Sequence, residues 1–128
     1  QLKGFRDTAV GAWEKAIAAT VVHYINDTKG DMDKCGEADY SFKTHAKHWG
    51  ELKGFALGLQ FNPHSPLHGS AQGATTTHFE DFHALVGDAP VLCGDAAAVT
   101  AYATDLDAAA AIFQTAYSFN ADNVANWK

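Results

Sequence analysis

Basic residues are scarce in this sequence of 128 residues, which carries nine Lys and Arg against fifteen Asp and Glu. The formal net charge is therefore −6, and the basic residues form no run. Nucleic acids and anionic membranes are recognised through clusters of Lys and Arg, so we expect neither as a partner. No apolar run approaches the roughly 20 residues of a transmembrane helix, so none is predicted. The sequence starts at Gln1 without a secretory leader, as a processed product would.

Cysteine is also rare, with only Cys35 and Cys93. Two cysteines are too few to define a disulfide framework. Each precedes a glycine and lies outside the strongest helical patterns, so the pair is expected to join two loops. Two buried free thiols are the alternative. The disulfide would close a loop of about 58 residues and would indicate export to an oxidising compartment.

Catalytic motifs are missing as well. The sequence has no Gly-x-Ser-x-Gly, P-loop, Gly-x-Gly-x-x-Gly or Cys-x-x-Cys pattern. Neither cysteine has the neighbouring histidine pattern of a thiol nucleophile. Hydrolysis of the zinc-peptidase kind needs the second histidine of His-Glu-x-x-His, which is absent. We therefore predict that the protein is not an enzyme.

What the sequence does have is helical periodicity. No stretch shows convincing period-two alternation, so sheet is not expected. Apolar residues recur instead at steps of three and four, the spacing of one helix face, and the length fits one domain. We predict an all-α fold: a single-domain four-helix bundle of three long helices and one short one. The approximate helix bounds are 7–25, 41–61, 78–86 and 96–119.

The segment 45–63 is the one around which we expect the other helices to pack. It has an apolar face at steps of four, three, four and three, formed by His45, Trp49, Leu52, Ala56 and Leu59.

Three glycines recur every four residues on a neighbouring face of this segment: Gly50, Gly54 and Gly58. Each costs roughly 1 kcal/mol against alanine in a helix interior. Because the helix retains these glycines despite their cost, we predict that the backbone of another helix lies close to this face. The first helix offers a small-residue edge for that contact, at Ala12, Ala16 and Ala19, beside an apolar stripe expected to face the core at Val10, Trp13, Ile17, Val21 and Tyr24.

The segments between these helices carry recognisable end signals. Residues 26–39 predict a polar loop, and its Asp31-x-Asp33 run is only distantly similar to a calcium loop because Phe42 replaces the twelfth-position glutamate. Asp39 or Ser41 is expected to cap the second helix. A capping box, a C-terminal glycine and a further cap are expected at Thr77/Glu80, Gly87 and Asp95. The polar tail contains Val124 and Trp127, which we expect to cover the end of the bundle.

Seven histidines are about twice the ordinary share. Helical bundles build metal sites from His and Glu three residues apart, because such residues project together. His48 and Glu51 are the only such helical pair here, and His45 lies one turn earlier. The alternatives are a hydrogen-bonded core histidine for His45 and a surface or hydrogen-bonded pair for the other two. The His48/Glu51 pair supplies only two ligands, whereas zinc normally needs at least three from the protein, so the pair alone is incomplete.

Three pieces of the sequence carry a family resemblance: RDTAVGAWEKAIAATVVHYINDT, KHWGELKGFALGLQFNPHSP and FHALVGDAP. They are similar to the C-terminal half of a family of uncharacterised bacterial envelope proteins, a domain of unknown function that resembles the imelysin-like helical-bundle proteins. The similarity runs from about Phe5 to Leu92. It implies an all-helical fold, a periplasmic or extracellular location, and one half of a two-bundle parent chain.

The imelysin-like proteins carry a Gly-x-His-x-x-Glu motif linked to iron uptake. His48 and Glu51 match that motif here, while Ala46 stands where the glycine belongs. Two functions are therefore expected. The first is an exported, non-catalytic binding or scaffold module that docks onto a larger envelope assembly or holds a ligand, its partner being another protein or the missing half of the parent. The alternative is a metal-binding or uptake protein that holds iron or another divalent metal through His48, Glu51 and His45.

Overall fold

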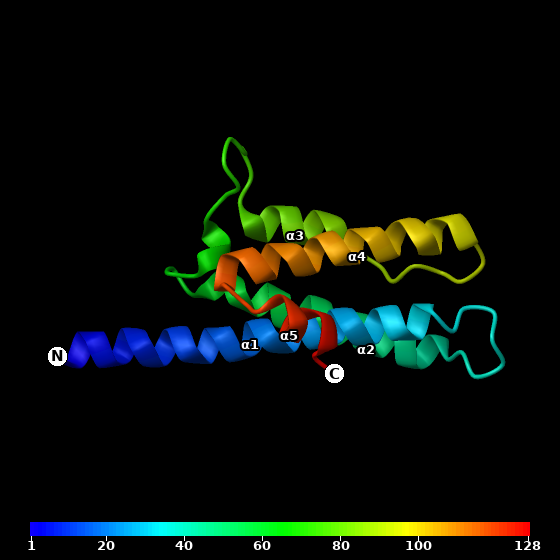
Figure 1. Cartoon of the computed structure of the whole chain (residues 1–128), viewed down its shortest axis with the longest axis horizontal. Coiled ribbons are helices and arrows are strands. Elements are labelled where there is room, and N and C mark those ends of the chain that lie inside the picture. Colours follow the sequence, from blue (N-terminus) through cyan, green and yellow to red (C-terminus); the bar gives the residue numbers. More distant parts are fainter.

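A computed structural model describes residues 1–128, and every regular element in it is helical. α1 and α2 form one antiparallel pair, α3 and α4 form a second pair, and the short α5 lies against α1 (Figure 1). The prediction of an all-α, single-domain helical bundle is confirmed, although the chain has five α-helices rather than four. In chain order the elements are α1 (Leu2–Met32), α2 (Phe42–Gly58), η1 (Leu59–Phe61), η2 (Pro66–His68), α3 (His78–Val86), α4 (Ala96–Tyr117) and α5 (Ala121–Asn126).

The first helix is longer than predicted at both ends. α1 continues through residues 26–31, which we had expected to belong to a loop, and ends at Met32. Two buried residues, Thr28 and Met32, continue the core-facing side of the helix beyond Ile25. The Thr28 hydroxyl donates to the carbonyl of Tyr24 at 2.7 Å. Burial of this last turn against the core therefore outweighs its polar composition.

The first half of α1 extends past the rest of the molecule (Figure 1). Residues 1–13 are all exposed, and Glu14 is the first buried residue of the helix. The expectation that Val10 and Trp13 face the core is wrong, since they are 44% and 75% exposed. The helical periodicity continues there, but no other element of the chain reaches far enough to cover it.

The second helix is the interior element that the sequence predicted. His45, Leu52, Ala56 and Leu59 are buried, and Trp49 packs half-buried against the same core. The indole of Trp49 donates from Nε1 to the Tyr102 hydroxyl at 2.9 Å. That hydroxyl donates in turn to the carbonyl of Val86 at 2.7 Å. α2 is thereby tied to both α3 and α4.

The predicted contact between the glycine face of α2 and the alanine edge of α1 is wrong. A Cβ at Gly50, Gly54 or Gly58 would meet no atom within 4 Å, so this face of α2 is open. The alanine edge instead borders the C-terminal segment, where a hollow is lined by residues that include Ala12, Ala16, Ala19, Phe119 and Trp127. The two helices pack through other faces, on which larger side chains such as Ile25 and Leu52 fill the space.

The helix ends follow the sequence signals closely. Ser41 caps α2, and Thr77 with Glu80 forms the capping box of α3. Gly87 ends α3 with a positive φ of 70°, a conformation that side chains disfavour. Asp95 accepts hydrogen bonds from two amides of the first turn of α4.

The C-terminal tail returns to the bundle, as expected. α5 is capped by Asn120. The Nδ2 group of Asn26 donates to the carbonyls of Val124 and Trp127, at 2.9 Å each. Because Val124 is buried and the ring of Trp127 lies at 4.8 Å from that of Phe119, the tail covers one side of α1.

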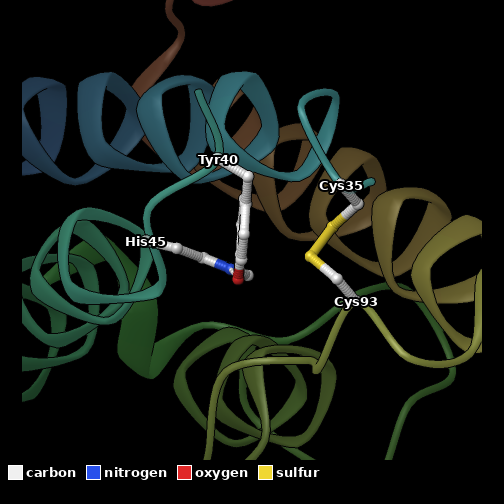
Figure 2. Close-up of a disulfide and its surroundings, with 4 residues drawn as sticks. All are labelled: Cys35, Tyr40, His45 and Cys93. Atoms are coloured by element: carbon white, nitrogen blue, oxygen red, sulfur yellow. Dashed lines mark hydrogen bonds between the residues drawn. A yellow bond between two sulfur atoms is a disulfide. The ribbon is translucent and has the colours of Figure 1, made fainter. Parts of the chain in front are cut away.

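Cys35 and Cys93 form the predicted disulfide, with their Cα atoms 5.2 Å apart. The bond joins the loop that follows α1 to the connector that precedes α4, beside the paired side chains of Tyr40 and His45 (Figure 2). It therefore links the two helix pairs at the end of the molecule opposite the protruding half of α1.

One helix, α4, is long and apolar enough to cross a membrane by length and composition alone. No such helix was predicted from the sequence. Leu106, Ala109 and Phe113 of this helix are fully buried in the bundle core. Core helices pass the same test of length and composition, so this finding is weak evidence for a membrane span.

Candidate functional site

His48 lies at the seam between α1 and α2, where it faces two carboxylates of α1. Its Nδ1 donates to Oδ2 of Asp31 at 2.7 Å, and its Nε2 lies 4.0 Å from Oδ2 of Asp27. Asp27 also lies 3.4 Å from Nε2 of His23, one turn earlier on the same helix. The four side chains form a polar seam that runs across the two helices. All four side chains are mostly shielded from solvent. Each imidazole lies beside a carboxylate, which fixes the orientation of its ring.

The other two predicted metal ligands point to different surroundings. Glu51 pairs with Lys47 of its own helix at 3.5 Å. His45 is fully buried, and its Nδ1 shares a hydrogen bond of 3.1 Å with the Tyr40 hydroxyl (Figure 2). Burial lowers the pKa of His45, against an opposing effect of Asp31. Burial and Asp31 both raise the pKa of Tyr40.

These positions test whether the residues present fit a metal ion. No group of three or more His, Cys, Asp and Glu side chains in the structure is arranged so that it could hold a metal ion. His48 directs its ring nitrogens at Asp31 and Asp27, while Glu51 is engaged by Lys47. His45 Nε2 is buried without a hydrogen-bond partner, and buried Glu51 Oε2 has only its ion pair with Lys47, but the two atoms do not form part of a common ligand set. The predicted set of His48, Glu51 and His45 does not fit a metal ion in this arrangement.

His83 of α3 is the most strongly perturbed histidine. Neither of its ring nitrogens has a hydrogen-bond partner, although both are buried. Burial, followed by the nearby Lys53 ammonium, lowers the pKa of His83 to about 4. Its ring packs edge-on against Phe79 and Phe82, with centroids 4.3 Å and 5.2 Å away. Such a histidine is neutral at physiological pH and acts as an aromatic core residue.

A buried carboxylate, Glu14, joins three parts of the chain. Glu14 is only 5% exposed to solvent. Oε1 accepts hydrogen bonds from the Ser65 hydroxyl at 2.5 Å and the Tyr117 hydroxyl at 2.7 Å, and Oε2 accepts one from Nδ2 of Asn62. Burial is the main cause of the raised pKa of Tyr117, and the Glu14 carboxylate adds to it. Glu14 therefore fixes α1 to the α2–α3 connector and to the end of α4.

Two hollows flank Glu14. One, of about 670 Å³, is lined by residues that include the charged Arg6 and Lys15 and also His64. The other, of about 550 Å³, has apolar walls that include Trp13 and Phe61. Val10, Glu14, Asn62 and Pro63 line both hollows. Volumes in this range are typical of small-molecule sites.

Sequence reasoning missed Glu14 entirely. Its three donors lie 48, 51 and 103 positions away, so no local spacing signals the cluster. The only available signal was a glutamate on the edge of an otherwise apolar helix face, and an exposed glutamate produces the same pattern.

The protruding half of α1 carries a second candidate feature, an apolar strip. Leu2 and Phe5 are 87% and 71% exposed. At about 100° per residue, the strip lies roughly opposite the side of α1 that enters the core. Its members recur at steps of three, four, three and four, the seam spacing of paired helices. We call it the docking strip, and it comprises Leu2, Phe5, Ala9, Ala12 and Ala16.

Compared with protein-family models, curated proteins and solved structures, the chain matches none. The family resemblance of the sequence therefore stays a prediction.

Proposed function

We propose that the protein is an exported, non-catalytic helical-bundle module that docks onto a larger assembly of the cell envelope. One observation carries the proposal: the docking strip presents large apolar side chains on a helix that runs beyond its own bundle. Exposed apolar patches of this kind mark interaction sites in folded proteins.

The partner that fits the strip is an α-helix of another protein. Heptad-like steps of three and four match the interdigitation of two helices, and the small side chains at Ala9, Ala12 and Ala16 allow close approach. Leu2, Phe5 and the neighbouring Trp13 offer roughly 500 Å² of apolar side chain between them. With the flanking polar groups this approaches the roughly 800 Å² per partner of an ordinary interface.

A lipid surface is the less suitable partner. The strip is flanked by Lys3, Arg6 and Lys15, but Arg6 is paired with Asp7 at 2.6 Å. The whole chain carries a net charge of −6, which disfavours approach to anionic headgroups.

The disulfide supports the exported location. Disulfides persist in the periplasm and outside the cell and are rare in the reducing cytosol. The Cys35–Cys93 bond links two otherwise separate loops, and the chain has no free cysteine.

The test is site-specific photocrosslinking in the source cells, with the crosslinking residue at Phe5 and, as a matched control, at the exposed Ala101 of α4. A discrete adduct from Phe5 alone is expected. The partner, once identified and purified, must then bind the wild type and lose affinity for Phe5→Asp. Equal labelling from both positions, adducts only with a second copy of this chain, or adducts only with lipid would each overturn the proposal.

A further inference from the structure

We propose that the apolar hollow beside Glu14 binds an organic ammonium ion, a positively charged nitrogen carried on an apolar body. This site, the Glu14 groove, is formed by Trp13, Glu14 and Ile17 of α1 with Leu59 and Phe61 of η1. It adjoins the docking strip, with which it shares Ala9, but unlike the strip it contains a carboxylate.

The missing positive charge at Glu14 is the first argument. A carboxylate offers about four acceptor positions, and three are used by the neutral donors Asn62, Ser65 and Tyr117. None of the ion pairs in the structure includes Glu14. A buried carboxylate normally has a cation as its partner. A bound ammonium ion would supply that charge.

The walls of the groove are the second argument. Trp13 and Phe61, 75% and 80% exposed, are two of the most exposed large apolar side chains in the chain, and both line this hollow. Aromatic faces attract ammonium groups, and tryptophan does so most strongly. Neither ring has a cation from this chain near it, because the only such contact is between Lys15 and Phe119. A carboxylate beside two free aromatic rings suits an ammonium ion with apolar substituents.

The nearby cations of the chain are already engaged. Arg6 and Lys15 line the other hollow, where Arg6 pairs with Asp7 and Lys15 lies 5.4 Å from the centroid of the Phe119 ring. Both therefore have other partners than the carboxylate of Glu14.

The experiment is a calorimetric titration of the folded full chain with 2-phenylethylammonium and with its uncharged analogue 2-phenylethanol. The ammonium is expected to bind at least tenfold more tightly than the alcohol, and Glu14→Gln should remove that preference. Glu37→Gln, in the exposed loop after α1, is the matched control and should leave both affinities unchanged. Equal affinities for the two probes, or a preference that survives in Glu14→Gln, would overturn the proposal.

A second variant protects the test against a folding defect in Glu14→Gln. Trp13→Ala removes an exposed side chain, so the fold should persist while the affinity for the ammonium falls at least threefold. An unchanged affinity in Trp13→Ala would also count against the groove. The source of the ammonium is separated by a third probe, N-acetyl-lysine-N-methylamide. Tighter binding of this lysine mimic indicates a lysine side chain of a polypeptide, and tighter binding of 2-phenylethylammonium indicates a free amine.

Discussion

His48 of α2 donates to Asp31 of α1 across 2.7 Å, which makes the central histidine of the sequence a helix-to-helix tie. Both side chains are largely shielded from water, so the pair differs from a solvated surface ion pair. A histidine held in this way by a carboxylate positions two helices relative to each other.

We expect His48→Ala to lower the free energy of unfolding by about 1–2 kcal/mol, because it leaves Asp31 without its donor. Urea denaturation at pH 7 measures the effect. His68→Ala, in the exposed connector, is the control and should change stability by less than about 0.5 kcal/mol. A loss no larger for His48 than for His68 would show that the tie is not energetically important.

Titration of the wild type, His48→Ala and His68→Ala with metal ions tests whether His48, Glu51 and His45 bind a metal. We expect no Fe²⁺ or Zn²⁺ affinity that depends on His48, because Glu51 and His45 are directed elsewhere. Calorimetry and elemental analysis give the answer. A stoichiometric metal that disappears in His48→Ala would contradict the structure at this point.

Reduction of the Cys35–Cys93 bond should destabilise the fold strongly. The bond closes a loop with a sequence separation of 58 residues, for which the chain-entropy estimate is about 4 kcal/mol. Urea unfolding with and without reductant measures the difference, and the Cys35→Ser/Cys93→Ser double variant should match the reduced protein. A double variant as stable as the oxidised wild type would refute the expectation.

Acid should weaken the fold through His83. Its pKa is about 4 in the folded protein and about 6.5 in an unfolded chain, so the unfolded state binds more protons between these values. Stability therefore falls as the pH drops from about 6.5 to 4, by about 2 kcal/mol after a discount for partial exposure. Urea denaturation at pH 7 and pH 5 should show a smaller loss in His83→Leu than in the wild type. If the wild type and His83→Leu lost the same stability between pH 7 and pH 5, the acid sensitivity would come from groups other than His83.

Two tryptophans provide a matched comparison of exposed and packed sites. Trp49→Ala should cost about 3 kcal/mol, since it removes a core side chain that bonds to Tyr102. Trp13→Ala should change stability by less than about 0.5 kcal/mol, because the side chain is 75% exposed. Thermal unfolding of both variants tests this. Similar losses at the two sites would mean that α1 is covered in solution.

Glycine-to-alanine substitution tests the open face of α2. Gly54→Ala should raise stability by about 0.5–1 kcal/mol, because the new methyl group meets no neighbour and alanine is the better helix former. Gly87→Ala is the opposite control and should lower stability, since the positive φ there strains any side chain. If Gly54→Ala instead destabilised the protein, another backbone would have to lie close to this face of α2, as the sequence predicted.

The parts of this fold that the sequence predicted are those encoded by neighbouring residues. The Thr77–Glu80 capping box and the Asp95 cap depend on spacings of two or three residues, which are visible in any sequence. The Glu14 cluster joins residues up to 103 positions apart and could not be found in this way. The position of Trp13 was predicted wrongly for a related reason: a helix face shows its periodicity whether or not another element reaches far enough to cover it.

The placement of the disulfide relative to the free end of α1 has a mechanical consequence. α1 is about 46 Å long, with the covalent link just beyond its C-terminal end and the docking strip at the other. Tension applied by a partner at the strip would pass along the helix axis toward Cys35. It would load the α1–α2 contacts in shear, all at once, instead of peeling them apart one turn at a time.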